Sequence, residues 1–354
     1  MSSVTEPMNA DDWTVPAVGS GSMTLVSGRD FAISDPGGDM VRGAVHGLIH
    51  GDRRYLDIWL LRLADLELRP LAATAPTPFS AVFVARVHEL DGRPLPVLII
   101  RRRSVGSGMR ETIEVHNSGR EPHELTMTVF AGADFSHLFD VKSAQPSSVH
   151  GTITATDGGV MIDHPDPEIG QRTLLALEPA PAEVDDQGWS WHLEIGPHSR
   201  HVARVTLDTV TSAPADEDLA ELDGPTTADG PNHRLDDLSH HRYETWQERV
   251  PTIVSSDPRL TVGVRKSLED LASLRIFDTA HPELAVVAAG APWYMTLFGR
   301  DALLTSYMAL PFAPELARGV LHELAELQGR TVDSGSGEEP GKIMHELREH
   351  GGAG

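Results

Sequence analysis

One segment combines aromatic side chains with an adjacent arginine and aspartate: Gly290–Leu310, GAPWYMTLFGRDALLTSYMAL. Its glycines and proline interrupt regular structure, so its first half is predicted to be a loop, with Arg300 and Asp301 starting an apolar helix. The aromatic residues of the loop are Trp293, Tyr294 and Phe298. Aromatic faces pack on a pyranose ring while arginine and aspartate bond its hydroxyl groups, which is typical of a sugar site. In the alternative, which stays open, Asp301 only caps the helix and stabilises its dipole.

A second segment, Asp333–Arg348, is a glycine-rich acidic loop, DSGSGEEPGKIMHELR, that leads towards a predicted helix. It is not a phosphate-binding loop, because Ser336 replaces the first glycine and an isoleucine follows the lysine. It is not a zinc-protease helix, because His350 comes one residue too late after His345 to share its helix face. The carboxylates left over are Glu338, Glu339 and Glu346. They either serve a site or belong to a solvated loop.

Two histidines four residues apart lie in the segment Gly43–Leu63, GAVHGLIHGDRRYLDIWLLRL. His46 and His50 would share a metal only on a helix, and the glycines that follow each of them disfavour one. A turn that leads into a structural strand is therefore predicted. We expect no metal site and no organic cofactor, and no Gly-x-Ser-x-Gly motif supports a serine hydrolase.

The composition excludes several classes of function. The chain has 354 residues, and 29 basic against 52 acidic side chains give a formal net charge of −23. This charge argues against partners such as nucleic acid or an anionic membrane surface, both of which need a basic face. There is no cysteine, no apolar run long enough to span a membrane and no secretory signal at the start. We therefore expect a cytoplasmic protein.

Alternating patterns predict that residues 20–210 form a β-sandwich, after a flexible N-terminus over residues 1–19. Leu125–Val129 alternates apolar residues with threonine, the period of a half-buried strand. Thr152–Thr156 and Val160–Asp163 flank a tight-turn sequence and suit a hairpin. Residues 211–233 are rich in proline, aspartate and glycine and are predicted to be an acidic linker.

Beyond the linker the periodicity becomes helical, over residues 234–354. Asp257 is a predicted N-cap with Pro258 in the first helical position, and one face of that helix carries Leu260, Val264, Leu268 and Leu271. Pro314 opens a second helix, closed by Gly329, whose apolar face is predicted to contain Leu316, Val320, Leu324 and Leu327. Further helices are predicted over residues 236–249 and 300–310.

These segments resemble bacterial glycogen-debranching-type proteins of the amylo-α-1,6-glucosidase family. In the first part the resemblance rests on HGLIHGDRRYLDIWLLRL, ETIEVHNSGREPHELTMTV and GADFSHLFDVKSA, of which the last, Gly132–Ala144, is the most distinctive. In the second part it rests on PWYMTLFGRDALLTSYMAL, ELARGVLHELAELQG and EEPGKIMHELR. The resemblance implies a β-sandwich followed by the first helices of an (α/α)6 glycosidase barrel.

The resemblance also implies hydrolysis of α-glucosidic bonds in an oligosaccharide or a glycogen-like glucan. Asp301 would be the general acid, which needs a second carboxylate opposite it to activate water. The residues implied around the glucose subsite are Trp293, Tyr294, Phe298, Arg300, Lys342, His345, Glu346 and Arg348. We expect a cleft at the junction of sandwich and helices that holds Asp301 and these side chains together.

The sequence departs from the family pattern after HELR, where relatives continue for several hundred residues and this chain ends in EHGGAG. We therefore expect an incomplete barrel that lacks the catalytic base, with an exposed helical face through which the chain could form an oligomer. An alternative is a non-catalytic protein that binds glucan or a partner. A third possibility is a structural sandwich with a disordered tail beyond about residue 230.

Overall fold

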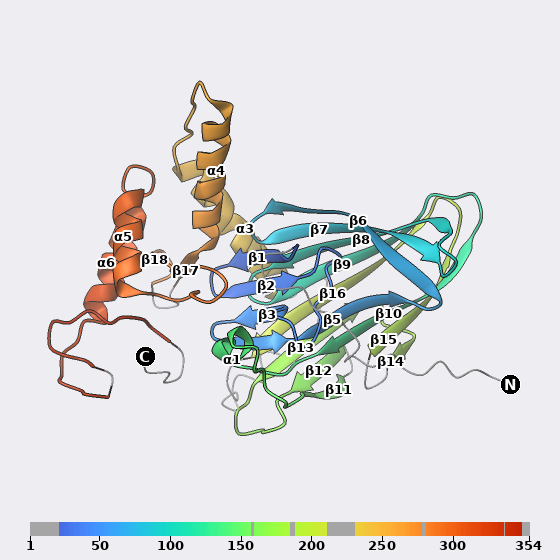
Figure 1. Cartoon of the computed structure of the whole chain (residues 1–354), viewed down its shortest axis with the longest axis horizontal. Coiled ribbons are helices and arrows are strands. Elements are labelled where there is room, and N and C mark those ends of the chain that lie inside the picture. The colour runs from blue at the N-terminus through green and yellow to red at the C-terminus, as the bar shows by residue number, and fades with distance from the viewer. Residues whose placement is uncertain are drawn as a thin grey trace.

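The computed structural model describes residues 21–156, 159–184, 188–210, 231–277, 281–335 and 337–348, without the side chains of 231–238. The strands come first along the chain and the longer helices follow, as predicted (Figure 1). The predicted flexible N-terminus, residues 211–230 of the predicted linker and the last six residues lie outside the described part.

Most of the strands form one large antiparallel sheet of twelve strands. In sheet order they are β11 (Thr152–Thr156), β12 (Gly159–Asp163), β13 (Arg172–Glu178), β16 (Arg200–Val210), β9 (Met109–Asn117), β8 (Pro94–Val105), β7 (Ser80–Glu89), β6 (Leu66–Thr77), β5 (Ile58–Leu63), β10 (His123–Gly132), β15 (Gly188–Ile195) and β14 (Glu183–Val184). The predicted alternation is confirmed in β10, where Leu125, Met127 and Val129 are buried and the threonines between them are half-buried. The predicted hairpin is also confirmed, because β11 pairs with β12.

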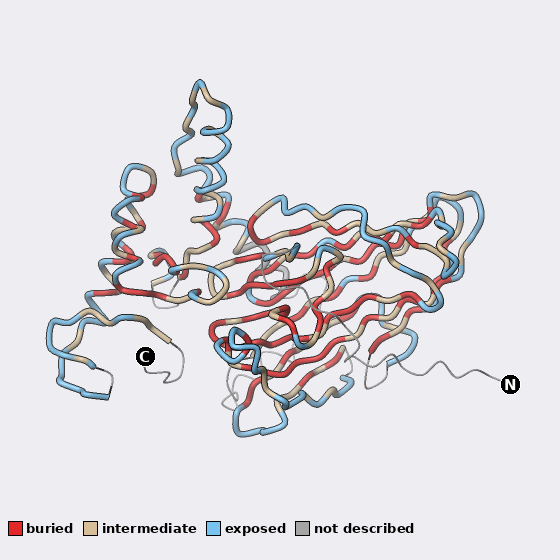
Figure 2. Tube along the Cα trace, viewed as in Figure 1, coloured by how far each residue is buried: buried red, intermediate tan, exposed pale blue. Residues whose placement is uncertain are grey.

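A second antiparallel sheet of four strands packs against the large one: β1 (Met23–Ser27), β2 (Asp30–Ser34), β3 (Gly47–His50) and β4 (Arg53–Leu56). The main hydrophobic core contains residues of both sheets, among them Leu48 and Tyr55 of the small sheet and Phe83 and Ile99 of the large one. Figure 2 shows the buried residues running along the strands. The architecture is a near-barrel sandwich, as the alternating sequence predicts.

Charged residues are buried inside this sandwich, which the sequence pattern did not predict. Arg101 donates from Nε to Glu111 Oε1 at 2.6 Å and from Nη1 to Asp39 Oδ1 at 2.6 Å. Arg103 donates from Nε to Glu111 Oε2, also at 2.6 Å. The Glu111 side chain is 0 % exposed and compensates the charge of both arginines, and Arg101 has Asp39 as a second partner.

Four longer helices follow the sheets: α3 (Pro231–Arg249), α4 (Pro258–Ser273), α5 (Gly299–Ala309) and α6 (Pro314–Glu326). Asp257 is the N-cap of α4, as predicted. The predicted linker was too long, because its last three residues already belong to α3. The predicted end of α6 was also wrong, because the C-cap is Leu327 and not Gly329. Leu327, predicted on the apolar face, is 37 % exposed at this end of the helix.

The helices lie in two pairs, α3 with α4 and α5 with α6 (Figure 1). A short ribbon of β17 (Arg275–Phe277) and β18 (Ala285–Val287) follows α4, and β18 packs on α5 and α6. Helix α4 projects from the body of the molecule, and Leu260 is 55 % exposed, so the predicted apolar face is buried only towards its C-terminal end. The described helices do not close a ring, and the toroid stays a prediction.

The chain after α6 is irregular, and the helix predicted to follow the acidic loop is not formed in the described residues up to Arg348. An isolated bridge joins Glu346 to Phe298 instead, because this segment runs alongside the loop before α5. Helix α5 exposes apolar side chains, as expected of an open helical face: Leu304, Tyr307 and Met308. In the described part of the chain, none of the helices combines the length and the apolar character that crossing a membrane requires.

Candidate functional site

The motif HGDRRYL anchors the segment GADFSHLFDVKSA through a buried ion pair. Arg54 on β4 pairs with Asp134, and the two side chains are 1 % and 3 % exposed. Arg54 also donates from Nη1 to the carbonyl oxygens of Ala44 (2.8 Å) and His46 (3.0 Å). Ser136 donates from Oγ to Asp134 Oδ2 at 2.5 Å. These bonds fix the chain that leads from β10 into the short helix α1 (Leu138–Lys142).

Helix α1 presents Phe139, Asp140 and Lys142 at the surface. Its N-cap is His137, whose Nδ1 accepts from the backbone N–H of Phe139 at 3.3 Å. Burial lowers the pKa of His137, which favours the neutral ring that this acceptor role requires. Leu138 is buried and donates its backbone N–H to the carbonyl oxygen of Asp52 at 2.9 Å. Phe139 and Lys142 therefore remain exposed beside the β3–β4 turn.

Arg348, near the end of the described chain, joins the helical part to the sandwich. Its Nη1 donates to Asp52 Oδ1 at 2.6 Å, and its Nε donates to Glu346 Oε2 at 2.8 Å. Its Nη2 donates to the carbonyl oxygen of Trp293 at 3.3 Å. The side chains of Arg348 and Asp52 are only 4 % and 7 % exposed, so this ion pair is shielded from water.

Aromatic rings surround this guanidinium group. Its Cζ atom lies 4.8 Å from the centre of the Phe139 ring and 5.5 Å from that of Phe298, within the range of cation–π contacts. The Phe298 ring makes edge contacts with Tyr294 at 5.8 Å and with His345 at 5.6 Å. The predicted loop and the acidic segment thus meet at Phe298.

The exposed rim of the cluster is formed by Lys142 and Tyr294. Lys142 donates from Nζ to the Tyr294 hydroxyl oxygen at 3.2 Å and lies 5.0 Å from the centre of its ring. The Tyr294 side chain is 43 % exposed, so one edge of the cluster is open to solvent. A polar ligand with an apolar face could contact both side chains there.

Five of the side chains predicted for the site lie together in this cluster: Tyr294, Phe298, His345, Glu346 and Arg348. Trp293 contributes its backbone carbonyl oxygen, which accepts from Arg348. Lys342 does not join them, because its Nζ donates to the carbonyl oxygen of Gly337 in its own loop at 2.6 Å. Arg300 and Asp301 are exposed in the first turn of α5, and neither side chain contacts a polar partner among the described residues. The N-cap of α5 is Phe298, so Asp301 does not cap the helix.

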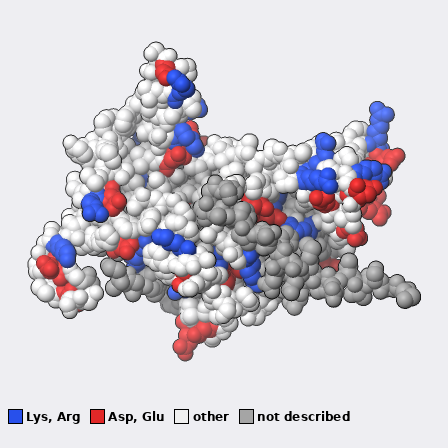
Figure 3. Space-filling model, viewed as in Figure 1, with Lys and Arg blue, Asp and Glu red and all other residues white. Residues whose placement is uncertain are grey.

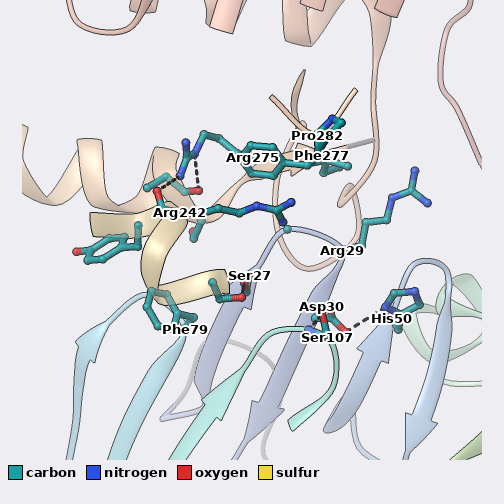
Figure 4. A pocket seen from close by; sticks show the side chains of 16 residues that line it. Ser27, Arg29, Asp30, His50, Phe79, Ser107, Arg242, Arg275, Phe277 and Pro282 are labelled. Atoms are coloured by element: carbon teal, nitrogen blue, oxygen red, sulfur yellow. Dashed lines mark hydrogen bonds and ion pairs between the residues drawn. The ribbon is translucent and has the colours of Figure 1, made fainter. Parts of the chain in front are cut away.

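The junction of sandwich and helices also contains a cavity of about 510 Å³. It lies between the β1–β2 turn and the helical part, and Figure 4 shows several of its lining side chains. None of the predicted site residues lines it, so this cavity is not the expected cleft. Arg29, Arg242 and Arg275 make its walls cationic, whereas Asp30 and His50 pair with each other at 3.0 Å.

Two of these arginines are held by aromatic rings. Arg242 Cζ lies 4.0 Å from the centre of the Phe277 ring, and Arg275 Cζ lies 4.6 Å from that of Trp246. Burial, and then the charge of Arg242, lower the pKa of Arg275 to about 10. Elsewhere, on the face drawn in Figure 3, basic and acidic side chains mostly lie next to one another rather than in a broad basic patch.

The sandwich motifs that contribute to this cluster lie within a match to a known family. Residues 25–206 match the family model described as the N-terminal domain of (some) glycogen debranching enzymes. The chain belongs to this family. A search of the curated proteins finds no match to the sequence. The residues that match the debranching-enzyme domain cover most of the sandwich, including Asp52 and all of α1. The helical part lies beyond the match.

A solved structure with a similar fold has low sequence identity to this chain. A putative kojibiose phosphorylase from the human microbiome has 9 % identity and a TM-score of 0.57, over 91 % of this chain and 48 % of that chain. This chain therefore spans about half the length of that protein. A putative aldose 1-epimerase from Escherichia coli K12 has 11 % identity over 54 % of this chain and 99 % of that one, with a TM-score of only 0.34.

The sequence prediction missed the contribution of the debranching-enzyme domain to the cluster. Asp52, Phe139 and Lys142 all belong to it and contact the predicted residues directly. The signal was present, because all three lie in the motifs that carry the family resemblance. Those motifs were interpreted as marks of the sandwich alone, since alternation explains the strands without a site.

Proposed function

We propose that the chain recognises an α-glucan at the cluster around Arg348 and contributes to hydrolysis of its α-glucosidic bonds, as in a glycogen-debranching-type glycosidase. The single observation that carries the proposal is the meeting of the family's sandwich with the loop before α5 at one partly exposed aromatic and charged cluster. The membership of the debranching-enzyme N-terminal domain family supports it.

The rim of the cluster has the chemistry that a glucose unit needs. The exposed ring of Tyr294 offers an apolar face. The exposed ring of Phe139, on α1, lies against the Arg348 guanidinium group. Lys142 and His345 provide polar atoms for the sugar hydroxyls. Arg348 is a positioning residue in this proposal, because its donors are already bonded to Asp52, Glu346 and the Trp293 carbonyl oxygen.

Asp301 is the proposed general acid. It lies in the first turn of α5, one turn after Phe298, and its carboxylate is exposed to solvent. The role requires a carboxylic acid that protonates the leaving oxygen while another carboxylate activates water. Asp52 and Glu346 are both ion-paired with Arg348, so the proposal assigns neither of them the role of base.

The second candidate is a glucan-binding protein without turnover. The observation that favours it is the same pair of ionic bonds, which uses both carboxylates of the cluster to hold Arg348. The two candidates share the binding rim and differ only in chemistry, so one set of variants distinguishes them.

The test measures binding and turnover of linear and branched maltooligosaccharides by the full chain. Tyr294→Ala should weaken binding at least tenfold, because it removes the exposed aromatic face of the rim. Tyr307→Ala is the matched control. Tyr307 is a 71 % exposed tyrosine on α5, and within the described residues its side chain makes no hydrogen bond or ring contact with the cluster. Asp301→Asn should leave binding intact and abolish any release of sugar, and Glu168→Gln is its exposed carboxylate control.

Release of sugar that depends on Asp301 supports the hydrolase. Binding that depends on Tyr294, with no sugar released by the wild-type chain, supports the binding protein instead. Absence of binding to all oligosaccharides, or equal effects of Tyr294→Ala and Tyr307→Ala, would refute both.

A further inference from the structure

Three side chains of the types that bind metal ions meet where the chain before β18 crosses α6. They are His281, His322 and Glu326, and their ligand atoms all lie within 4.8 Å of one another. Both histidines direct Nε2 to the same carboxylate oxygen, Glu326 Oε1, at 3.6 Å for His281 and 3.5 Å for His322. Within the described residues this is the one such group of three or more.

The fold places two of these side chains on a helix and the third on a turn. His322 and Glu326 are one turn apart on α6, so both project from the same face of the helix. One turn before His322, Gly319 lets the backbone of β18 lie directly on α6: a Cβ atom there would be 2.1 Å from the carbonyl oxygen of Ala285. A turn closed by a 3.0 Å bond from the Leu284 N–H to the His281 carbonyl oxygen then places the third side chain over the helix.

The spacing fits a shared metal ion better than hydrogen bonds. Distances of 3.5 and 3.6 Å exceed the usual 2.7–3.2 Å of a hydrogen bond from nitrogen to oxygen. Two ligands of a tetrahedral zinc ion, each bonded at about 2.0–2.1 Å, stand about 3.3 Å apart. The two nitrogen-to-oxygen separations are therefore close to those around a bound ion, and the two histidine nitrogens lie within 4.8 Å of each other.

An unsatisfied polar atom points the same way. His322 Nε2 is shielded from solvent and has no hydrogen-bond partner. Buried polar atoms without a partner are rare in folded proteins, and each needs a reason. The two histidine rings are also in edge contact, 4.6 Å between their centres, so both side chains crowd the same spot.

We propose that His281, His322 and Glu326 bind a divalent zinc-class metal ion, with a fourth position open to water. Two imidazole nitrogens and one carboxylate oxygen suit Zn²⁺, Co²⁺ or Ni²⁺, whereas Ca²⁺ and Mg²⁺ prefer oxygen ligands throughout. The ion would join the chain before β18 to α6. The motif-based expectation of no metal site did not anticipate it, because His281 is remote in sequence from the other two ligands.

The test adds Co²⁺ to the tag-free, chelator-treated full chain and follows its visible absorption, then displaces it with Zn²⁺. We expect one ion per chain and an absorption band typical of low coordination number. His322→Ala and Glu326→Gln should each weaken Zn²⁺ binding at least tenfold, since even outer-shell changes typically cost 10–100-fold. His241→Ala and Glu168→Gln, both exposed and outside the group, should leave the affinity unchanged.

A second measurement covers any variant that folds poorly. Zn²⁺ should raise the melting temperature of the wild-type chain and of both controls, but not that of His322→Ala or Glu326→Gln. Absence of cobalt absorption with no thermal shift, or a shift that survives in the ligand variants, would overturn the proposal. None of these readouts depends on glucan binding or turnover.

Discussion

Replacing Glu111 with glutamine tests whether the buried charges of the sandwich are needed for its stability. The Glu111 side chain is fully buried and accepts from the Nε atoms of Arg101 and Arg103, both at 2.6 Å. Glutamine keeps the shape of the side chain but removes the charge, and it turns an NH2 group towards a guanidinium. After the change Arg101 is still paired directly with Asp39, whereas Arg103 has no carboxylate in direct contact among the described residues and keeps the Gly38 carbonyl oxygen and the face of Phe83.

The expected loss follows from burial. Breaking a buried ion pair by removing one partner costs about 3–5 kcal/mol, because a charge is left uncompensated away from water. We expect Glu111→Gln to lose about 4 kcal/mol of the free energy of unfolding. The matched control is Asp163→Asn on the same sheet, whose side chain and that of its partner Arg172 are 29 % and 31 % exposed. There the expected loss is at most about 1 kcal/mol.

The assay is urea unfolding of the full chain at pH 7, followed by tryptophan fluorescence. Trp59 and Trp189 are fully buried in the sandwich and report on its unfolding. A loss below about 1 kcal/mol for Glu111→Gln, or one no larger than that of Asp163→Asn, would refute the reasoning.

The contacts of Glu111 with Arg101 and Arg103 also predict how stability depends on pH. Burial acts to raise the pKa of Glu111, but the charges of Arg101 and Arg103 outweigh it and hold that pKa below its usual value. A carboxyl group with a lowered pKa contributes stability that is complete above its unfolded pKa, about 4.3, and lost as the pH falls through the folded value. The gap between wild type and Glu111→Gln should therefore narrow below about pH 4.

Three further predictions use the same unfolding assay or a titration. Gly319→Ala should lower the free energy of unfolding by about 1–3 kcal/mol, because the new Cβ would overlap the carbonyl oxygen of Ala285 on β18. Gly263→Ala on α4, where the space is open, should raise it by up to about 1 kcal/mol. A change in the same direction for both variants would contradict this reasoning. Burial, and then the charge of Arg54, lower the pKa of His46 to about 4, so its NMR titration should have a midpoint near 4. The free energy of unfolding should therefore fall as the pH drops from about 6.5 towards 4. A titration midpoint near 6.5 would contradict this. A double-mutant cycle with Asp52→Asn and Arg348→Lys should give a coupling of about 1–3 kcal/mol, and additive losses would mean that this ion pair does not join the two parts of the chain.

Local patterns in the sequence determined much of the sandwich. The alternation over Leu125–Val129 predicted β10 because side chains on successive strand residues face opposite sides of a sheet. The Asp257 cap was equally readable, since its carboxylate bonds a backbone N–H only two residues away, in Arg259. Both features depend on neighbours in sequence, which is why a single chain is enough to find them.

Helix ends and the apolar face of α4 were less well predicted, because packing decides them. Leu327 has the right spacing for the buried face of α6 but lies at its C-cap, beyond the elements that cover Leu316 and Val320. Leu260 has the right spacing on α4 but nothing covers the projecting end of that helix in the described chain. Periodicity shows which face is apolar and not what will pack against it.

The sequence named many residues of the cluster, but only the tertiary structure decided which of them meet. The sequence supplied the motifs and the family, but Asp52 and Arg348 are separated by almost the whole described chain and meet at 2.6 Å. Lys142 of the sandwich domain and Tyr294 of the helical part, 152 residues apart, also meet. Such pairs form because the sandwich and the helical part pack together, and no local spacing in a single sequence encodes which surfaces will meet.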